Sequence, residues 1–178
     1  MKKLNQIIVT SRPQQITKNF LVLIPLFFTI NIWFNQQDVS GVISIILKSL
    51  LAFVIAVLIS SAAYYINDLL DINQDKNHPT KKNRPIAHGY ISVKLAITII
   101  IILVTSSLTL SFIISYQMFL ATFTYLIINV FYSLYLKNIV IIDILCISAS
   151  FVIRAIMGSI AIDYSIITID ENQIELDL

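Results

Sequence analysis

The 178-residue sequence has little charge, little glycine, little proline and almost no cysteine. Lys, Arg, Asp and Glu together make up 12% of it, whereas 57% is hydrophobic and the mean hydropathy is +0.85. A soluble domain carries about 45–50% apolar and about 25% charged residues, so a soluble globular protein is excluded. Three glycines and four prolines leave few turns, and the apolar runs do not alternate as the strands of a membrane barrel do. The composition therefore predicts a polytopic membrane protein built from long helices.

The single cysteine and the small net charge restrict the chemistry further. Cys146 has no partner for an internal disulfide and lies in an apolar run, which is typical of a packed or lipid-facing residue. The two histidines have no second His or Cys at zinc spacing. A net charge of +2 gives no argument for nucleic acid as a partner.

Five apolar segments approach or exceed the length of about 20 residues that a spanning helix needs. Lys and Arg gather before the first segment, between the second and third, and between the fourth and fifth. By the positive-inside rule these regions face the cytoplasm. We expect an all-α, polytopic transmembrane helical bundle in the cell (plasma) membrane, a single domain over 1–178 with about five spanning helices. The predicted segments are 20–34, 49–66 (with an earlier start at Val42 as the alternative), 95–115, 116–136 and 140–162.

Three regions lie outside these segments. Residues 1–19 have a basic start and no signal-peptide core, so they are expected to be a cytoplasmic lead-in. Residues 67–89 form an Asp-rich loop that is also expected in the cytoplasm. Residues 163–178 contain five acidic and no basic residues; after five spans this atypical acidic tail is expected outside the cell.

The loop 67–89, NDLLDINQDKNHPTKKNRPIAHG, carries most of the polar chemistry. Asp68, Asp71 and Asp75 stand at i, i+3 and i+7, which places three carboxylates along one face of a helix. Like charges on one stripe repel each other, so the spacing indicates a bound cation. Oxygen ligands without cysteine favour Mg²⁺ or Ca²⁺, and Mg²⁺ is usually shared with substrate phosphates.

A basic cluster follows the acidic stripe. The helix should end by His78, because Pro79 disfavours the helical conformation in the residue before it. Lys81, Lys82 and Arg84 come next; Lys meets phosphate as a point charge, and Arg binds it with two parallel hydrogen bonds. The departure of a diphosphate requires acidic residues that bind a metal ion and basic residues that bind phosphate. The alternative is a charged, solvated cytoplasmic loop.

Arg154 is the charged residue deepest within an apolar segment. Such a residue usually faces the bundle interior or a water-filled cavity. Two roles are open for it: a residue of the functional site, or the partner of a buried acid.

The motifs resemble those of the UbiA-type intramembrane prenyltransferases. NDLLDINQD at 67–75 and RPIAHG at 84–89 are similar to the first Asp-rich motif of that family. HPTK at 78–81 resembles, more specifically, the branch typified by decaprenyl-phosphate phosphoribosyltransferase. The likeness covers roughly residues 12–161. Weaker matches are SRPQQITKN at 11–19, YSLYLK at 132–137 with Asp143, and FVIRA at 151–155.

This resemblance implies nine helices around a central cavity and a Mg²⁺-dependent transfer that involves a polyprenyl lipid. In the phosphoribosyl branch, a polyprenyl phosphate attacks phosphoribosyl diphosphate and releases diphosphate. In the broader family, a prenyl diphosphate alkylates an acceptor. The resemblance assigns Asp68, Asp71 and Asp75 to Mg²⁺ and catalysis. It assigns Lys18, Asn67, Lys81, Arg84, Tyr132, Lys137 and Arg154 to substrate binding.

The sequence departs from the family in one respect. Members carry a second Asp-rich motif several helices later, and these 178 residues do not contain it. We therefore expect an N-terminal piece of a longer enzyme, with a missing C-terminal half as a partner. A different class remains open: a non-catalytic membrane remnant or subunit that binds lipid phosphate or a partner half. An ion transporter is less favoured, because the acids lie at a loop end and not at mid-membrane.

Overall fold

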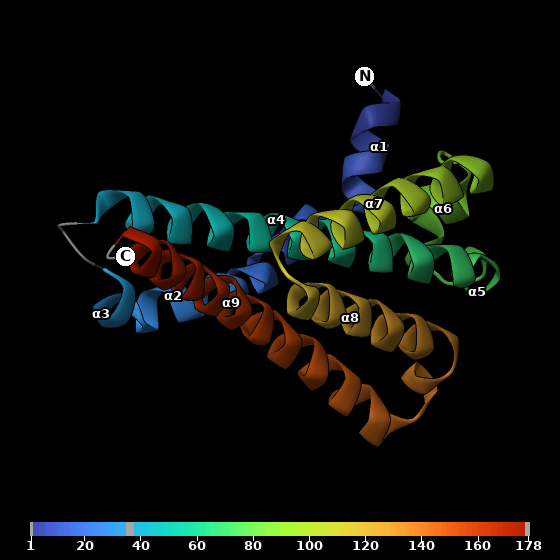
Figure 1. The fold of residues 1–178 in the computed structure, drawn as a ribbon. Helices are drawn as coiled ribbons and strands as arrows, with labels where there is room; N and C mark the ends of the chain where they lie inside the picture. The colour runs from blue at the N-terminus through green and yellow to red at the C-terminus, as the bar shows by residue number, and fades with distance from the viewer. Residues whose placement is uncertain (1, 35–37, 177–178) are drawn as a thin grey trace.

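The computed structural model describes residues 2–34 and 38–176, and side chains are described for these except 2, 3, 138 and 163–176. The described chain is helical and contains no strand (Figure 1). This confirms the predicted all-α class. The elements are α1 (Lys2–Thr10), η1 (Pro13–Leu23, a 3₁₀ segment), α2 (Ile24–Phe28), α3 (Ile30–Trp33), α4 (Val39–Leu70), α5 (Ile72–Lys76), η2 (Lys81–Asn83), α6 (Pro85–His88), α7 (Val93–Ile114), α8 (Tyr116–Leu134), η3 (Leu136–Asn138) and α9 (Val140–Leu176).

Helix α4 is the centre of the bundle. It contacts α7, α8, α9 and η1, and in Figure 1 it runs through the molecule from the end near α3 to α5. One stripe of α4 consists of small buried residues at spacings of three and four, which lets partner backbones come close. Because η1 and α9 both pack there, residues far apart in sequence meet beside α4. The stripe is Ser49, Ala52, Ala56, Ser60 and Ala63.

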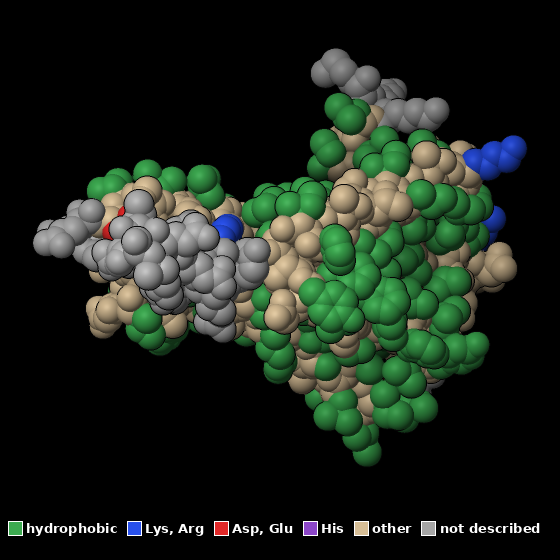
Figure 2. All heavy atoms as spheres, in the orientation of Figure 1, with side chains coloured by type: hydrophobic (Ala, Val, Ile, Leu, Met, Phe, Trp, Pro, Cys, Tyr) green, Lys and Arg blue, Asp and Glu red, His purple; other side chains and the backbone are tan. Residues whose placement is uncertain are grey.

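Four helices of the described chain are long and apolar enough to cross a membrane. They are α4, α7, α8 and the part of α9 from Val140 to Ile162. Apolar side chains cover much of the face seen in Figure 2, where some Lys and Arg side chains project from one edge and another lies within the face. Such a surface fits a lipid environment and confirms the predicted polytopic bundle.

The first predicted span, 20–34, is not one helix. Its residues belong to η1, α2 and α3, which meet at Leu23 and Thr29. Pro25 has no N–H to donate and its ring clashes with the preceding turn; the Thr29 hydroxyl then bonds the Pro25 carbonyl at 2.8 Å. Among the described residues there are therefore four continuous candidate spans, where five were expected.

Two of the spans are longer than predicted. Helix α4 begins at Val39 and ends at Leu70, so it extends beyond the predicted 49–66 in both directions. The backbone of α9 continues to Leu176, into the expected acidic tail. The side chains of that tail lie outside the described residues.

Candidate functional site

The acidic stripe crosses the joint between α4 and α5. Asp71 lies between the two helices with φ −89° and ψ 3°. The Asp71 N–H still donates to the Asn67 carbonyl at 3.0 Å, and the Asp75 N–H to the Asp71 carbonyl at 2.8 Å. The chain thus stays nearly helical until α5 ends at Lys76, before the limit that Pro79 was expected to set.

Asp68 and Asp75 are tied together by one arginine. Arg84 Nη1 lies 3.2 Å from Asp68 Oδ1 and 2.8 Å from Asp75 Oδ2. Arg12 forms a second ion pair with Asp68 Oδ1. The two acids are 3% and 2% exposed, so they are buried charges that require these partners.

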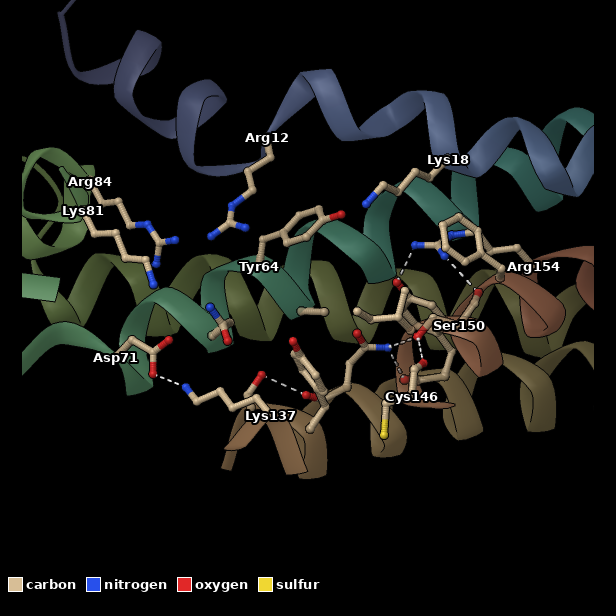
Figure 3. Close-up of a pocket in the computed structure, with 18 residues that line it drawn as sticks. Arg12, Lys18, Tyr64, Asp71, Lys81, Arg84, Lys137, Cys146, Ser150 and Arg154 are labelled. Carbon is tan, nitrogen blue, oxygen red and sulfur yellow. Dashed lines mark hydrogen bonds and ion pairs between the residues drawn. The ribbon is translucent and has the colours of Figure 1, made fainter. Parts of the chain in front are cut away.

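Asp71 forms its ion pair elsewhere, with Lys137 of η3. The pair joins the end of α4 to the connection between α8 and α9, and Figure 3 shows it at the edge of a cavity. The joint role expected for the three carboxylates stays a prediction; in the described structure two of them share Arg84, and the third pairs with Lys137. The slight break at Asp71 accompanies this division.

The cavity has a volume of about 370 Å³ and lies between α4, α8, α9 and the start of η1 (Figure 3). Its walls are strongly positive, because six basic side chains and one acidic side chain, Asp71, line it. Tyrosine rings and short polar groups of α4 and α8 complete the wall. The basic residues are Arg12, Lys18, Lys81, Arg84, Lys137 and Arg154.

The structure brings most of the predicted site residues to this one cavity, although segments as distant as η1 and α9 supply them. Their roles stay predictions. Asp68 and Asp75 are not among the lining residues; they lie behind Arg12 and Arg84. The predicted residues that line the cavity are Lys18, Asn67, Asp71, Lys81, Arg84, Tyr132, Lys137 and Arg154.

Arg154 faces the bundle interior and is 4% exposed. Its Nε donates to Asn19 Oδ1 at 2.8 Å, its Nη2 to the Tyr125 hydroxyl at 2.7 Å, and its Nη1 to the Ser150 carbonyl at 2.9 Å. No described acid forms an ion pair with it. Of the two roles left open by the sequence, pairing with a buried acid is therefore not found in the described part of the chain.

Several lining residues were not predicted from the sequence. Arg12 adopts the left-handed conformation, with φ 51° and ψ 66°, and its guanidinium lies 4.8 Å from the Tyr64 ring centroid. A signal existed for Tyr64, which precedes Asp68 by one helical turn. Tyr125 and Asn129 on α8 carried no such signal, because only packing turns them towards the cavity.

The donor chemistry fits Mg²⁺, since the acidic groups here are carboxylates, whose oxygens suit this hard cation. Among the described residues, Asp71 is the one carboxylate that lines the cavity. Among the described residues, however, no three Asp, Glu, His or Cys side chains are grouped so as to hold a metal ion. Each of the three aspartates has one carboxylate oxygen in ion pairs with Arg12, Arg84 or Lys137, and its other oxygen is in no ion pair among the described residues.

Comparison with known proteins gives a family match over most of the chain. The model of the UbiA prenyltransferase family matches residues 21–173. Decaprenyl-phosphate phosphoribosyltransferase of Mycolicibacterium smegmatis is 34% identical over 154 residues, which cover 85% of this chain and 46% of that protein. The protein of the same name from Corynebacterium glutamicum is 35% identical over 153 residues, with 84% and 44% covered. The chain thus spans about half the length of these curated relatives.

A solved structure has the same fold. It is described as digeranylgeranylglyceryl phosphate synthase in membranes, and it aligns with a TM-score of 0.77 at 23% identity. The alignment covers 90% of this chain and 54% of that one. At this identity the likeness concerns the fold alone.

Proposed function

The chain belongs to the UbiA prenyltransferase family, and on that premise we propose that it forms the basic half-site of a Mg²⁺-dependent membrane transferase. The reaction proposed is transfer of phosphoribose from phosphoribosyl diphosphate to a polyprenyl phosphate. The names of the phosphoribosyltransferases that are 34% and 35% identical support this branch of the family.

One observation carries the proposal: a cavity beside apolar helices has six basic side chains and one acidic side chain in its wall. Both proposed substrates are multiply anionic, and one of them has a lipid tail. In the transfer, an oxygen of the lipid phosphate forms a bond to ribose C1. The bond from C1 to the diphosphate oxygen breaks, and its electron pair leaves with the diphosphate.

The residues at the Asp71 end would receive the diphosphate. Lys81 and Arg84 line this end together with Lys137, and each supplies positive charge for the leaving oxygens. When bound, Mg²⁺ would neutralise charge on the diphosphate, with Asp71 as the carboxylate that holds it from the cavity. Arg12 and Arg84 form ion pairs with Asp68 and Asp75 behind the wall.

Calorimetry in lipid nanodiscs tests this assignment. Inorganic diphosphate should bind in the presence of Mg²⁺. Asp71→Asn should weaken this binding by tenfold or more, because the loss of one interaction with a charged group costs about 1.5–3 kcal/mol. Arg84→Ala should weaken it more than Lys82→Ala does, because Lys82 is not among the lining residues. Unchanged Mg²⁺-dependent binding in the Asp68, Asp71, Asp75 triple alanine variant would contradict the proposal.

The ion pairing of all three aspartates favours a second candidate, a non-catalytic subunit that binds lipid phosphate. In such a protein the acids only support the basic wall. Diphosphate or lipid phosphate would then bind equally well with and without Mg²⁺, whereas the transferase requires the metal.

The orientation proposed places the N-terminus and the α5–α6 region in the cytoplasm. Helix α4 has 32 residues and is about 48 Å long at 1.5 Å per residue, whereas the hydrocarbon core is about 30 Å thick. The end that carries Asp68 can therefore reach the interface. Lys76, Lys81 and Lys82, which are exposed there, favour the cytoplasmic side.

A further inference from the structure

Helix α1 extends away from the bundle. In Figure 1 it runs outward, across the direction of α4 and α7. Its second half holds it to the other helices. Thr10 is buried, Ile7 packs against the apolar cluster that contains Tyr65, and the Tyr65 hydroxyl donates to the Ile7 carbonyl at 2.9 Å. The position of α1 relative to the bundle is therefore fixed.

The side of α1 that leaves these contacts is apolar. Leu4 is 64% exposed, and Ile8 and Val9 are each 49% exposed. Leu4 and Ile8 are four residues apart and share one face of the helix. Five of the nine residues of α1 are polar, so the helix is amphipathic, and it is too short to span a bilayer. Such a helix is stable when its apolar face enters the boundary between lipid head groups and acyl chains.

The bundle places α1 at the level of that boundary. The cluster that receives Ile7 also contains Ile91 and Ala96, which lie just before and within the first turn of α7. Helix α7 has 22 residues and is about 33 Å long, whereas the hydrocarbon core is about 30 Å thick. The two ends of α7 therefore lie close to the two boundaries of the core. Since α1 packs at one of these ends, its exposed face is continuous with the lipid-facing surface of the spans.

The charges at this end complement an anionic membrane surface. Lys2 and Lys3 begin α1, and the first acidic residue of the sequence is Asp38. Lys94, at the start of α7, is exposed, whereas the three aspartates within residues 67–89 are buried. Basic residues beside a bilayer are attracted to anionic lipid head groups.

We propose that α1 is an interfacial helix that docks on the membrane surface and prefers anionic phospholipids. Leu4, Ile8 and Val9 enter the boundary between head groups and acyl chains, and Lys2 and Lys3 supply the attraction to anionic heads. A lipid surface is favoured over a second copy of the chain, because the apolar face begins at the boundary that the spans already set. The inference rests on the spans and not on the proposed transfer reaction.

Fluorescence in nanodiscs tests this docking. Leu4→Cys, in a Cys146→Ala background, carries an environment-sensitive fluorophore on the most exposed apolar residue of the face. The nanodiscs contain phosphatidylcholine alone or with phosphatidylglycerol. Quenching by lipids brominated near the head group measures the docked state, and quenching by aqueous iodide measures the undocked state. A label at Ile101→Cys, which is exposed in the middle of α7, is the reference for a lipid-facing position.

The label at position 4 should be quenched by the brominated lipid and protected from iodide when phosphatidylglycerol is present. Ile8→Gln should lower the ratio of docked to undocked label about tenfold or more, the factor expected when one Ile side chain is no longer buried. Asn5→Gln, an exposed polar residue of the same helix, is the matched control and should leave the ratio unchanged. An unchanged signal from the Ile101 label shows that the spans of each variant remain folded.

The lysines should account for the lipid preference. Omitting phosphatidylglycerol should lower the ratio, and so should the double substitution Lys2→Gln with Lys3→Gln, by roughly fivefold for each lysine. Accessibility to iodide in phosphatidylglycerol nanodiscs would overturn the docking. Protection from iodide without quenching by brominated lipid would also overturn it, because a second copy or another protein would then cover α1. Equal docking with and without phosphatidylglycerol would overturn the preference for anionic lipid.

Discussion

Arg84 is the residue on which two buried acids depend. Among the described residues it is the ion-pair partner of Asp75 and one of the two ion-pair partners of Asp68. Arg84→Ala would leave Asp75, at 2% exposure, without a counter-ion. We expect a loss of about 3–5 kcal/mol in the free energy of unfolding, as is usual when one member of a buried pair is removed.

Unfolding in mixed micelles of increasing denaturing detergent measures this loss. Lys82→Ala is the control, since exposed Lys82 has no ion pair among the described residues; its change should stay within about 0.5 kcal/mol. Equal effects of the two substitutions would show that Arg84 does not stabilise the acids.

Gly158 lets α9 approach η1 closely. A Cβ at this position would lie 2.0 Å from the Val22 carbonyl oxygen and 2.8 Å from the Val22 carbonyl carbon. Backbone must therefore move in Gly158→Ala, and we expect a cost of about 1–3 kcal/mol.

The neighbouring substitution Ser159→Ala is the matched test, because Ser159 is exposed and bonds only its own helix. It should leave the free energy of unfolding unchanged when this is measured, as for Arg84→Ala, in mixed micelles of increasing denaturing detergent. Wild-type behaviour of Gly158→Ala would mean that α9 and η1 are farther apart than described.

The elements differ in how far sequence alone determines them. Helices α7 and α8 follow directly from uninterrupted apolar runs, and Ser115 separates them as expected, with its hydroxyl accepting from the Met118 N–H at 3.0 Å. The first segment does not follow from hydropathy, because Pro25 interrupts the hydrogen bonds within an apolar run. Hydropathy measures how strongly a segment prefers lipid, whereas the continuity of a helix depends on backbone N–H groups that donate to the preceding turn.

Asp38 caps the start of α4. Its Oδ1 accepts from the Gly41 N–H at 3.0 Å and from the Ser40 hydroxyl at 2.8 Å, and these bonds lower the pKa of the Asp38 carboxyl below its usual value. A lowered pKa in the folded state means that the cap stabilises α4 above the unfolded pKa of about 3.9. That contribution is lost as pH falls through the lower folded value.

An NMR titration of the Asp38 carboxyl should therefore give a pKa below about 3.9. Amide protection at the start of α4 should decrease over the same pH range. Asp38→Asn, which caps nearly as well without titrating, should remove this pH dependence. A folded pKa equal to or above the unfolded one would contradict the cap.

At the scale of the whole molecule, the sequence predicted which residues lie at the site better than it predicted the contacts between them. Spacing and composition put Asp71, Lys81 and Arg84 in one loop, and the structure places all three on one cavity. Spacing could not show that Lys137 would pair with Asp71, or that Asn19 would anchor Arg154. Such contacts join residues 66 and 135 positions apart, and only the packing around α4 brings them together.

The proposed topology has a direct test at this scale. Asn77→Cys lies just after α5 in the segment that leads to the start of α7, and Tyr116→Cys lies just beyond the end of α7; each variant, in a Cys146→Ala background, carries one exposed thiol. With 22 residues, α7 is about 33 Å long and can cross the hydrocarbon core. A membrane-impermeant maleimide added to intact cells should label Cys at 116 and should label Cys at 77 only after lysis. Labelling of both before lysis would exclude the orientation.

The contacts between the N-terminal residues and the end of α4 set an order for biosynthesis. The Tyr65 hydroxyl donates to the Ile7 carbonyl across 58 residues, and Arg12 meets Asp68 across 56. At about 5–20 residues per second, the ribosome needs roughly 3–12 s after making Ile7 and Arg12 to make their partners Tyr65 and Asp68. Until then Arg12 has no acid to offset its left-handed backbone, which costs on the order of 1–3 kcal/mol. The beginning of the chain is therefore among the first parts to be made and among the last to reach its final shape.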